Sequence, residues 1–249
     1  MEFHGSRRRL VRSTGFFFDH PGGRRKTLQR LTAPRGRAQS TVTTEGGQGV
    51  TSDRGTGGPS PQSREGAILS RLGKRTIVLI GMMGAGKSSI GRRLATRLGL
   101  PFVDADDEIE RAANMSIPEI FERHGEPYFR DGERRVIERL LEDGPQVLAT
   151  GGGAFMNEET RANIARGGIS IWLNAEFEVL MNRVRRRSHR PLLRNPDPEG
   201  VMKRLLAERN PVYAGADLEL RSRDVPHEVV IDDLLKLLDE HLASREAAD

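Results

Sequence analysis

The chain has 249 residues, with 40 lysines and arginines against 35 aspartates and glutamates, and it contains no cysteine. This length is sufficient to bury a sizeable core in one large domain or two small ones. The lack of cysteine excludes disulfides, thiol nucleophiles and cysteine-ligated zinc from its structure and chemistry. No apolar run is long enough to cross a membrane, so we expect no membrane partner.

The first 74 residues differ in composition from the rest of the chain. They hold 14 of the 40 basic side chains, 5 of the 35 acidic ones and 13 of the 28 glycines. Such a segment cannot bury enough apolar surface to offset its ordering entropy, so we predict that residues 1–74 are a disordered basic extension. Three interpretations remain open: an inert or misassigned extension, an organelle transit peptide, or a tail that attracts nucleic acid.

The first predicted strand, residues 76–80, leads into the segment "GMMGAGKSS" at residues 81–89. This segment matches the phosphate-loop pattern G-x-x-x-x-G-K-[ST]. Glycines allow backbone N–H groups to turn towards an anion, and the helix that follows adds the positive end of its dipole. We predict that Ser88 is a ligand of Mg²⁺ and that the nucleotide is bound by Gly84, Ala85, Gly86, Lys87, Ser88 and Ser89.

The second predicted strand, residues 101–106, runs into the acidic segment "VDADDEIE". Asp104 and Asp106 are two residues apart, so an extended backbone directs both towards one side, at the sheet edge where ligands bind. One of them could approach Mg²⁺ through a water, and the other could accept a proton from a substrate hydroxyl. The alternative is that Asp106 or Asp107 merely caps the next helix.

The middle of the chain predicts a helix and a third strand. The helix begins with Ser116 and Glu119 at capping-box spacing and ends at Gly125. Further on, Arg130 and Glu133 are three residues apart and therefore share a helix face. The third strand, residues 146–150, continues into three glycines at 151–153, which indicate either a close approach to a ligand or a flexible turn.

The last third of the chain predicts a helix at 157–168, a strand at 169–174, a strand at 218–222 and a closing helix at 229–242. Strands that alternate with helices predict an α/β fold with a parallel sheet covered on both faces. The arginine-rich segment "NRVRRRSHRPLLRNPDPEG" could supply positive charge during phosphoryl transfer, or it could be a solvated basic surface. Arg209 lies late in a helix, where a lone arginine is usually a favourable C-terminal charge.

From residue 75 to about 245 the chain resembles the shikimate kinase family. The resemblance rests on "GMMGAGKSSIGRRLA", "FVDADDEIE", "SIPEIFERHGEPYFRDGE", "TGGGA", "RPLL" and "ERNPVY", in family order and at family spacing. It implies a three-layer P-loop kinase fold in residues 75–249, with a five-stranded parallel sheet of order 2-3-1-4-5, helices on both faces and a lid at about residues 187–200. It also implies ATP-dependent phosphorylation of the 3-hydroxyl of shikimate, with Mg²⁺ as the metal.

The same resemblance implies a role for individual residues. Catalysis is expected from Lys87, Asp106 and Arg190. The metal is expected at Ser88 and Asp104. Arg183 is expected to flank adenine, and Arg190 of the lid to contact the phosphates. Shikimate is expected to be held by Asp106, Arg130, Gly152, Gly153 and Arg209. Ser89 stands where the family often has threonine, a change that removes no metal ligand.

Two other classes of function remain as alternatives. Another small-molecule kinase of the same architecture, acting on gluconate or a nucleotide, would share the phosphate loop, although paired arginines beside three glycines favour a small carboxylated polyol. An ATP-binding regulator or nucleic-acid-binding protein is suggested only by the basic extension. We expect a cytoplasmic monomer that binds ATP and shikimate and no nucleic acid, with an organelle location if residues 1–74 are a transit peptide.

Overall fold

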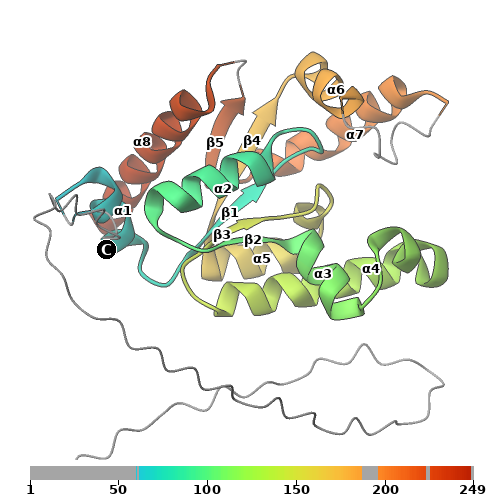
Figure 1. Cartoon of the computed structure of the whole chain (residues 1–249), viewed down its shortest axis with the longest axis horizontal. Coiled ribbons are helices and arrows are strands. Elements are labelled where there is room, and N and C mark those ends of the chain that lie inside the picture. Colours follow the sequence, from blue (N-terminus) through green and yellow to red (C-terminus); the bar gives the residue numbers. More distant parts are fainter. Residues whose placement is uncertain (1–59, 61, 187–195, 223–224, 248–249) are drawn as a thin grey trace, which may run out of the picture. The chain divides into compact units, whose positions relative to one another are not determined.

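A five-stranded parallel sheet forms the centre of the computed structural model, which describes residues 60, 62–186, 196–222 and 225–247 (Figure 1). The strands are β1 Thr76–Ile80, β2 Phe102–Asp104, β3 Val147–Ala149, β4 Gly168–Ala175 and β5 Leu218–Ser222. The helices are α1 Arg64–Leu72, α2 Lys87–Leu98, α3 Ala105–Ala113, α4 Ile117–Glu142, α5 Glu158–Gly167, α6 Phe177–Arg185, α7 Pro198–Tyr213 and α8 His227–Glu246, with a short 3-10 helix, η1, at Ala154–Met156.

The strand order is β2-β3-β1-β4-β5, and all four strand pairs are parallel, which confirms the predicted order 2-3-1-4-5. The bounds of β1 and β5 agree with the prediction. The second strand is shorter than the predicted 101–106, because α3 begins at Ala105, directly after β2. The last residue of β2, Asp104, therefore directly precedes the helix α3, and Asp106 lies in the first turn of that helix.

The helices divide between the two faces of the sheet. The connection from β1 to β2 runs in one direction across the sheet, whereas the later connections run in the other. Right-handed crossovers therefore place α2 on the opposite face from the helices between the later strands. In agreement, α2 packs with α1 and α8, while α3, α4 and α5 pack together and α5 covers β4 (Figure 1).

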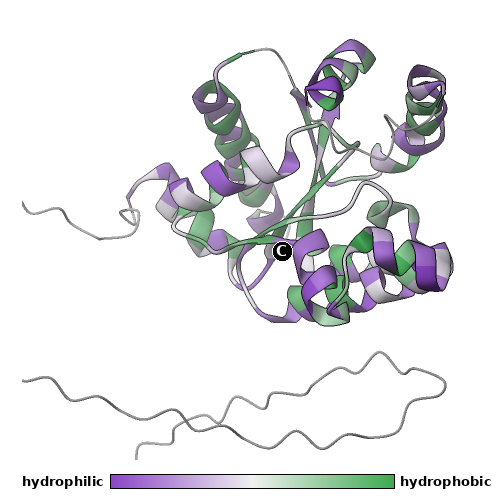
Figure 2. Cartoon of the chain, turned by 45° about the vertical axis from the view of Figure 1, so that its right-hand side comes forward, coloured by the Kyte–Doolittle hydropathy of each residue, from purple (hydrophilic) through white to green (hydrophobic). Residues whose placement is uncertain are grey.

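The sheet interior is almost entirely apolar. All residues of β1 and β3 are buried, and Ile77, Val78 and Leu79 are 0 % exposed. Figure 2 shows these hydrophobic strands enclosed by helices that carry hydrophilic residues on their outer sides. Strands buried on both faces have continuous apolar sequences instead of alternating ones, and "TIVLI" of β1 shows this pattern.

Helix α4 consists of two helical segments joined at Gly125. The first begins with the predicted capping box, in which Ser116 and Glu119 bond to each other's backbone N–H groups. Gly125 interrupts the helical backbone with a φ of +78°, which glycine adopts without a steric cost. The predicted helix end at Gly125 is confirmed, and the segment after it carries Arg130 and Glu133.

The predicted boundary of the N-terminal extension at residue 74 is wrong. Helix α1 lies within the last part of that segment, is capped by the Ser63 side chain, and packs against α8. Its Ile68 and Leu72 are 0 % and 1 % exposed, and Arg71 forms ion pairs with Asp239 and Glu246 of α8. The folded part therefore includes α1. Residues 1–59 lie outside the described residues, so the prediction of disorder there stays a prediction.

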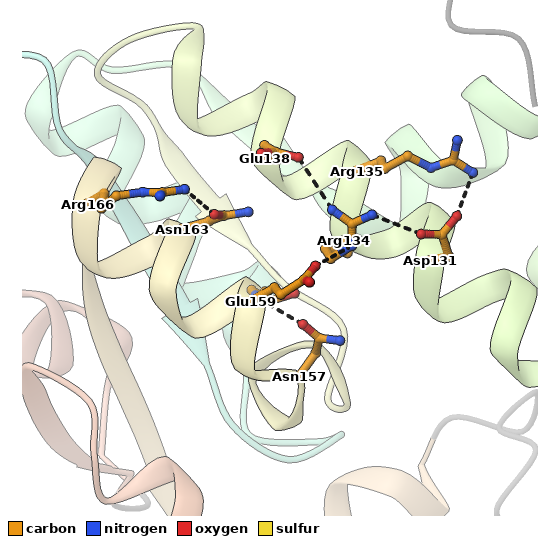
Figure 3. Close-up of polar contacts among 9 residues, drawn as sticks. Asp131, Arg134, Arg135, Glu138, Asn157, Glu159, Asn163 and Arg166 are labelled. Atoms are coloured by element: carbon orange, nitrogen blue, oxygen red, sulfur yellow. Dashed lines mark hydrogen bonds and ion pairs between the residues drawn. The ribbon is translucent and has the colours of Figure 1, made fainter.

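Ion pairs on the solvent side of α4 join it to α5 (Figure 3). Arg134 contacts Asp131 and Glu138 on its own helix, and its Nε lies 3.0 Å from a carboxylate oxygen of Glu159 on α5. Arg135 pairs with the other oxygen of Asp131. Because these carboxylates are well exposed, each pair contributes at most about 1 kcal/mol, so the network supports the packing of α4 and α5 without determining it.

The chain reverses its direction across the sheet between β1 and β3, which are neighbours. Ligands of such sheets bind in the crevice outside the carboxyl ends of the strands at this reversal point. The phosphate loop follows β1, and the three glycines at 151–153 follow β3, so both segments meet at this point. Among the described residues, no helix is both long enough and apolar enough to span a membrane.

Candidate active site

The phosphate loop joins the carboxyl end of β1 to the first turn of α2. Gly84 and Gly86 have φ angles of +85° and +100°, which side-chain-bearing residues rarely adopt. A Cβ on Gly84 would also lie 3.1 Å from Val184 Cγ2, so a helix packed beside the loop leaves no space for one. Between them, Ala85 donates its N–H to the carbonyl of Met82. The loop is thus held as a compact turn in front of the α2 N-terminus, a geometry that binds anions.

Lys87 is the first residue of α2 and turns back over the loop. Its Nζ donates to the carbonyl oxygens of Gly81 and Met82, at 2.8 and 3.0 Å. These bonds hold the ammonium group at the mouth of the loop, where a nucleotide phosphate would replace the carbonyls as its partner.

Ser88 and Asp104 meet across the gap between α2 and β2. The Ser88 hydroxyl donates to Asp104 Oδ2 at 2.7 Å, and Asp104 Oδ1 accepts the backbone N–H of Asp106 at 3.2 Å. Asp104 is therefore the N-cap of α3, and the alternative in which Asp106 or Asp107 makes this cap is wrong. Because each carboxylate oxygen has its own partner, Asp104 is fixed beside Ser88.

A hydroxyl and one carboxylate are the hard oxygen ligands that Mg²⁺ takes from proteins when it keeps most of its waters and binds substrate phosphates. The Ser88–Asp104 pair fits that ion. Within the part of the chain that the structure describes, no group of three or more acidic, histidine or cysteine side chains forms a dedicated metal cage.

Charged side chains lie close to the three glycines after β3. A Cβ on Gly151 would lie 2.6 Å from Glu133 Oε1 and 3.1 Å from Asp106 Oδ1. A Cβ on Gly153 would lie 2.6 Å from both terminal nitrogens of Arg130. The glycines thus let charged groups from α3 and α4 approach one segment of backbone closely, and the alternative of a flexible turn stays open.

Arg130 is held by two carboxylates. Its Nη1 lies 2.7 Å from Glu133 Oε2, and its Nη2 lies 3.0 Å from Glu126 Oε1. Burial opposes the charged form of Arg130, but Glu133 and Glu126 outweigh it and raise its pKa, so the guanidinium stays charged.

Glu133 is the most buried charged group of the site, with only 2 % of its surface exposed. Burial raises its pKa, and the nearby charge of Asp106 adds to this effect, while Arg130 and Arg209 oppose it. One oxygen, Oε2, pairs with Arg130, whereas Oε1 is buried without a hydrogen-bond partner among the described residues. Glu133 therefore lies between the residues predicted to bind the acceptor and has one oxygen unsatisfied.

Arg209 reaches the glycine turn from α7. A Cβ on Gly152 would lie 3.4 Å from Arg209 Nη1. One turn further along α7, Tyr213 is 0 % exposed and donates its hydroxyl proton to the carbonyl of Gly152. Arg209 thus lies against the glycine turn, next to the residues predicted to bind the acceptor.

Arg183 and Ser89 lie on the other side of the phosphate loop. Arg183 Nη1 donates to the Ala85 carbonyl at 3.3 Å and to the Ser222 hydroxyl at 3.0 Å. The Ser89 hydroxyl lies 3.2 Å from Nε2 of His227, the first residue of α8. These groups line a cleft of about 450 Å³ that Asp104, Asp106 and Gly152 also line.

Of the predicted residues, the cleft is lined by Gly84, Gly86, Lys87, Ser88, Ser89, Asp104, Asp106, Gly152 and Arg183. Arg130, Gly153 and Arg209 are not among its lining residues and lie at the glycine turn beside it. The predicted catalytic and phosphate-binding Arg190 lies outside the described residues, as do residues 187–195 of the predicted lid. The end of the predicted lid, 187–200, overlaps the first turn of α7, which begins at Pro198.

Three residues of the site had no predicted role there: Glu133, Tyr213 and His227. The three-residue spacing from Arg130 indicates the ion pair of Glu133, but not its burial. Tyr213 lies within "ERNPVY", four residues after Arg209, so helical periodicity places both on one face. His227 is 138 residues from Ser89 in sequence, and no local pattern predicts their contact.

This arrangement can perform a phosphoryl transfer. The loop, Lys87 and the Ser88–Asp104 pair suit a nucleotide triphosphate with its metal, and the arginines at the glycine turn suit a small acid. Asp106 lies between the two halves and lines the cleft, where a carboxylate can accept a proton from a hydroxyl.

Comparison with known proteins gives the family. The family model for shikimate kinase matches residues 83–239. The chain is 64 % identical over 190 residues to a shikimate kinase of Bradyrhizobium diazoefficiens, covering 76 % of this chain and 92 % of that protein. It is 62 % identical over 187 residues to a shikimate kinase of Rhodopseudomonas palustris, covering 75 % of this chain and 91 % of that protein.

Solved structures agree with these relatives. A shikimate kinase from Acinetobacter baumannii in complex with shikimate is similar with a TM-score of 0.63 and 37 % identity, over 66 % of this chain and 93 % of that one. A shikimate kinase from Bacteroides thetaiotaomicron is similar with a TM-score of 0.61 and 30 % identity, over 66 % of this chain and 98 % of that one. The chain therefore belongs to the shikimate kinase family.

Proposed function

We propose that this chain phosphorylates shikimate in the cleft at the ends of β1 and β3. The activity of the shikimate kinase family is the ATP-dependent phosphorylation of the 3-hydroxyl of shikimate. The observation that carries the proposal is the approach of Arg130 and Arg209 to the same glycine turn, beside Asp106 and the phosphate loop. Two guanidinium groups suit the carboxylate of a small acid, since each can form paired hydrogen bonds to it.

We assign the nucleotide to the phosphate loop and the metal to Ser88 and Asp104. The backbone from Gly84 to Ser89 and the Lys87 ammonium bind the phosphates of ATP. Mg²⁺, when bound, neutralises charge on the β- and γ-phosphates. The 2.7 Å bond between Ser88 and Asp104 supports this assignment, because it already brings the two protein oxygens together. Arg183, which lines the same cleft, flanks the adenine base.

We assign the acceptor to the glycine turn. Arg130 and Arg209 bind its carboxylate, and the backbone at Gly152 and Gly153 lies against its ring. Asp106 orients the reacting hydroxyl and accepts its proton as the phosphoryl group arrives. Arg190 is proposed, from the "RPLL" motif alone, to add positive charge during the transfer. Positioning and electrostatic stabilisation then supply most of the rate enhancement, as expected for a loose phosphoryl-transfer transition state.

We also propose a monomeric cytoplasmic enzyme that needs no nucleic-acid partner. The relatives named above come from bacteria, which favours the cytoplasm over import into an organelle. The nucleotide-binding and acceptor-binding groups all come from one chain, which supports a monomer.

A coupled assay of ADP release tests the proposed reaction. Purified protein is supplied with ATP and Mg²⁺ and, in separate reactions, with shikimate, gluconate or a nucleoside monophosphate. We expect turnover with shikimate alone, because only a carboxylated ring with neighbouring hydroxyls satisfies both the arginines and Asp106. Turnover with gluconate alone, or with a nucleotide alone, would overturn the proposal.

Asp106→Asn tests the catalytic assignment. We expect kcat to fall by about 10²–10⁴-fold, since an amide cannot accept the hydroxyl proton, while ATP still binds. Asp107→Asn is the matched control, because Asp107 is the next residue of the same helix and is exposed. A kcat for Asp106→Asn close to that of the Asp107→Asn control would remove Asp106 from catalysis.

A further inference from the structure

Tyr213 connects two of the groups assigned to the acceptor. It is the last residue of α7 and is 0 % exposed, so its hydroxyl contacts protein groups and no solvent. The hydroxyl donates its proton to the carbonyl oxygen of Gly152, and the Arg209 side chain lies beside the same glycine, with Nη1 3.4 Å from the position of a Cβ there. Since α7 and the glycine turn after β3 are about 60 residues apart in sequence, this hydroxyl is a direct link between them.

The environment keeps the hydroxyl in the form that this link requires. Burial raises the pKa of Tyr213, and this outweighs the lowering effect of Arg209. The neutral phenol has one proton, given to Gly152, and lone pairs left to accept from a guanidinium. Its ring packs beside Trp172 of β4, with 6.0 Å between ring centroids, so the ring position does not depend on the hydroxyl.

Arg209 depends on this hydroxyl more than an ordinary arginine would. Its Nε is buried and has no hydrogen-bond partner among the described residues. No carboxylate within ion-pair distance of Arg209 is found among those residues either, whereas Arg130 has two. Without the Tyr213 hydroxyl, little would fix the direction of the Arg209 guanidinium.

We propose that Tyr213 is a positioning residue for acceptor binding, whose hydroxyl fixes the Gly152 carbonyl and, beside it, the Arg209 guanidinium, in the arrangement in which Arg209 binds the substrate carboxylate. This rests on the proposed function, in which Arg209 and Gly152 contact shikimate. Tyr213 acts through these two groups and does not itself contact the substrate. Its contribution is to pre-organise the site, which lowers the cost of binding.

Tyr213→Phe tests the proposal, because it removes the hydroxyl and keeps the ring. We expect the KM for shikimate to rise about tenfold, the equivalent of one hydrogen bond to a charged group, while the KM for ATP stays within about twofold. Thr76→Val is the matched control. It also removes a buried hydroxyl that donates to a carbonyl, that of Gly144 at 3.0 Å, but at the opposite end of β1. Its KM for shikimate should not change.

A double-mutant cycle with Arg209→Ala separates positioning from general structural damage. If Tyr213 acts through Arg209, Tyr213→Phe should have little further effect on the KM for shikimate once Arg209 is removed. The proposal is overturned by equal increases in both KM values, by an unchanged KM for shikimate, or by additive effects in the cycle. A Tyr213→Phe chain that fails to fold would also contradict it, since the hydroxyl would then be needed for the fold itself.

The result also distinguishes the two proposals. A parent protein that does not phosphorylate shikimate contradicts the proposed function. A parent protein that turns shikimate over normally, with a Tyr213→Phe variant of unchanged KM, contradicts only the positioning role.

Discussion

At the scale of single residues, Glu133 shows how the site keeps a buried negative charge beside its arginines. Its carboxylate is 2 % exposed, pairs with Arg130 at 2.7 Å and lies near Asp106 at the glycine turn. Removing one member of such a pair leaves the other charge buried and uncompensated, which is costly. Glu133 therefore helps to fix Arg130, and its own ionisation is coupled to the fold.

The raised pKa of Glu133 predicts a pH-dependent stability. Its unfolded value is about 4.5, and burial raises the value in the fold. At a pH between the unfolded and the folded pKa, Glu133 binds a proton in the folded protein but not in the unfolded chain. The stabilisation of the fold by this proton is therefore complete below about pH 4.5 and is lost as the pH rises through the folded pKa. Glu133→Gln does not titrate. We expect the stability of the parent relative to Glu133→Gln to fall as the pH rises from 4.5.

Urea unfolding of both proteins between about pH 4.5 and 8 measures this difference, because other titrating groups cancel in the comparison. Glu119→Gln is a control whose difference from the parent should stay constant over this pH range. The Ser116 hydroxyl and backbone bonds lower the pKa of Glu119, so its contribution is complete above 4.5 and is lost only at lower pH. If the free energy of unfolding of the parent minus that of Glu133→Gln stays constant or grows with pH, Glu133 does not have a raised pKa in the fold.

At the scale of secondary-structure elements, α1 is the addition that composition did not predict. It is nine residues long, contains Gly66, and follows a segment rich in glycine and serine. A helix this short is marginal by itself, so its stability comes from burying Ile68 and Leu72 against the rest of the fold. Its ion pairs with α8 are partly exposed and contribute less.

Ile68→Ala tests whether α1 belongs to the cooperative fold. We expect the free energy of unfolding to fall by about 2–5 kcal/mol, the usual cost of this truncation in a packed core. Ser70→Ala, on the exposed side of the same helix, should change it by less than about 0.5 kcal/mol. Denaturant unfolding measures both. Equal and small effects would mean that α1 is not packed against α8 in solution.

The break in helix α4 at Gly125 changes the direction of the chain before the segment that carries Arg130 and Glu133. The glycine at 125 ends one helical segment, and the next segment carries Arg130 and Glu133 towards the turn after β3. Ion pairs of Arg134 with Glu138 and Glu159 lie on the solvent side of α4 (Figure 3). The helix thus has a functional face and a face that packs with α5.

At the scale of the whole molecule, every group assigned to the reaction and described by the structure lies between Gly81 and His227. A chain that begins at residue 60 keeps α1 and the complete cleft, whereas one that begins at residue 75 loses α1. We expect the first to have the kcat, KM values and melting temperature of the full chain. The second should melt at a lower temperature, because the surface of α8 that α1 covers would be exposed.

Steady-state kinetics of the two truncated chains measure kcat and the KM values, and thermal unfolding measures their melting temperatures. A large change in either KM for the chain that begins at residue 60 would mean that residues 1–59 take part in substrate binding.

Contiguous segments could be predicted from the sequence. The phosphate loop is one stretch between an apolar strand and a helix, and its chemistry follows from glycines, Lys87 and Ser88 in fixed order. The bounds of β1 and β5, the capping box of α4 and its end at Gly125 are equally local, since each depends on neighbouring residues. The strand order came from the resemblance to shikimate kinases, not from spacing.

Contacts between distant segments could not be predicted from local patterns, and the expected pairing of Ser88 with Asp104 came from the family resemblance alone. Asp104 serves both Ser88 and the cap of α3, and the Tyr213 hydroxyl lies on Gly152, because the sheet brings together segments far apart in the chain. Helix α1 packs against α8, which lies more than 150 residues further along the chain. Sequence patterns report what a residue can do with its neighbours. Burial, pKa shifts and shared hydrogen bonds arise when separate segments exclude water together, and only the folded chain specifies which segments those are.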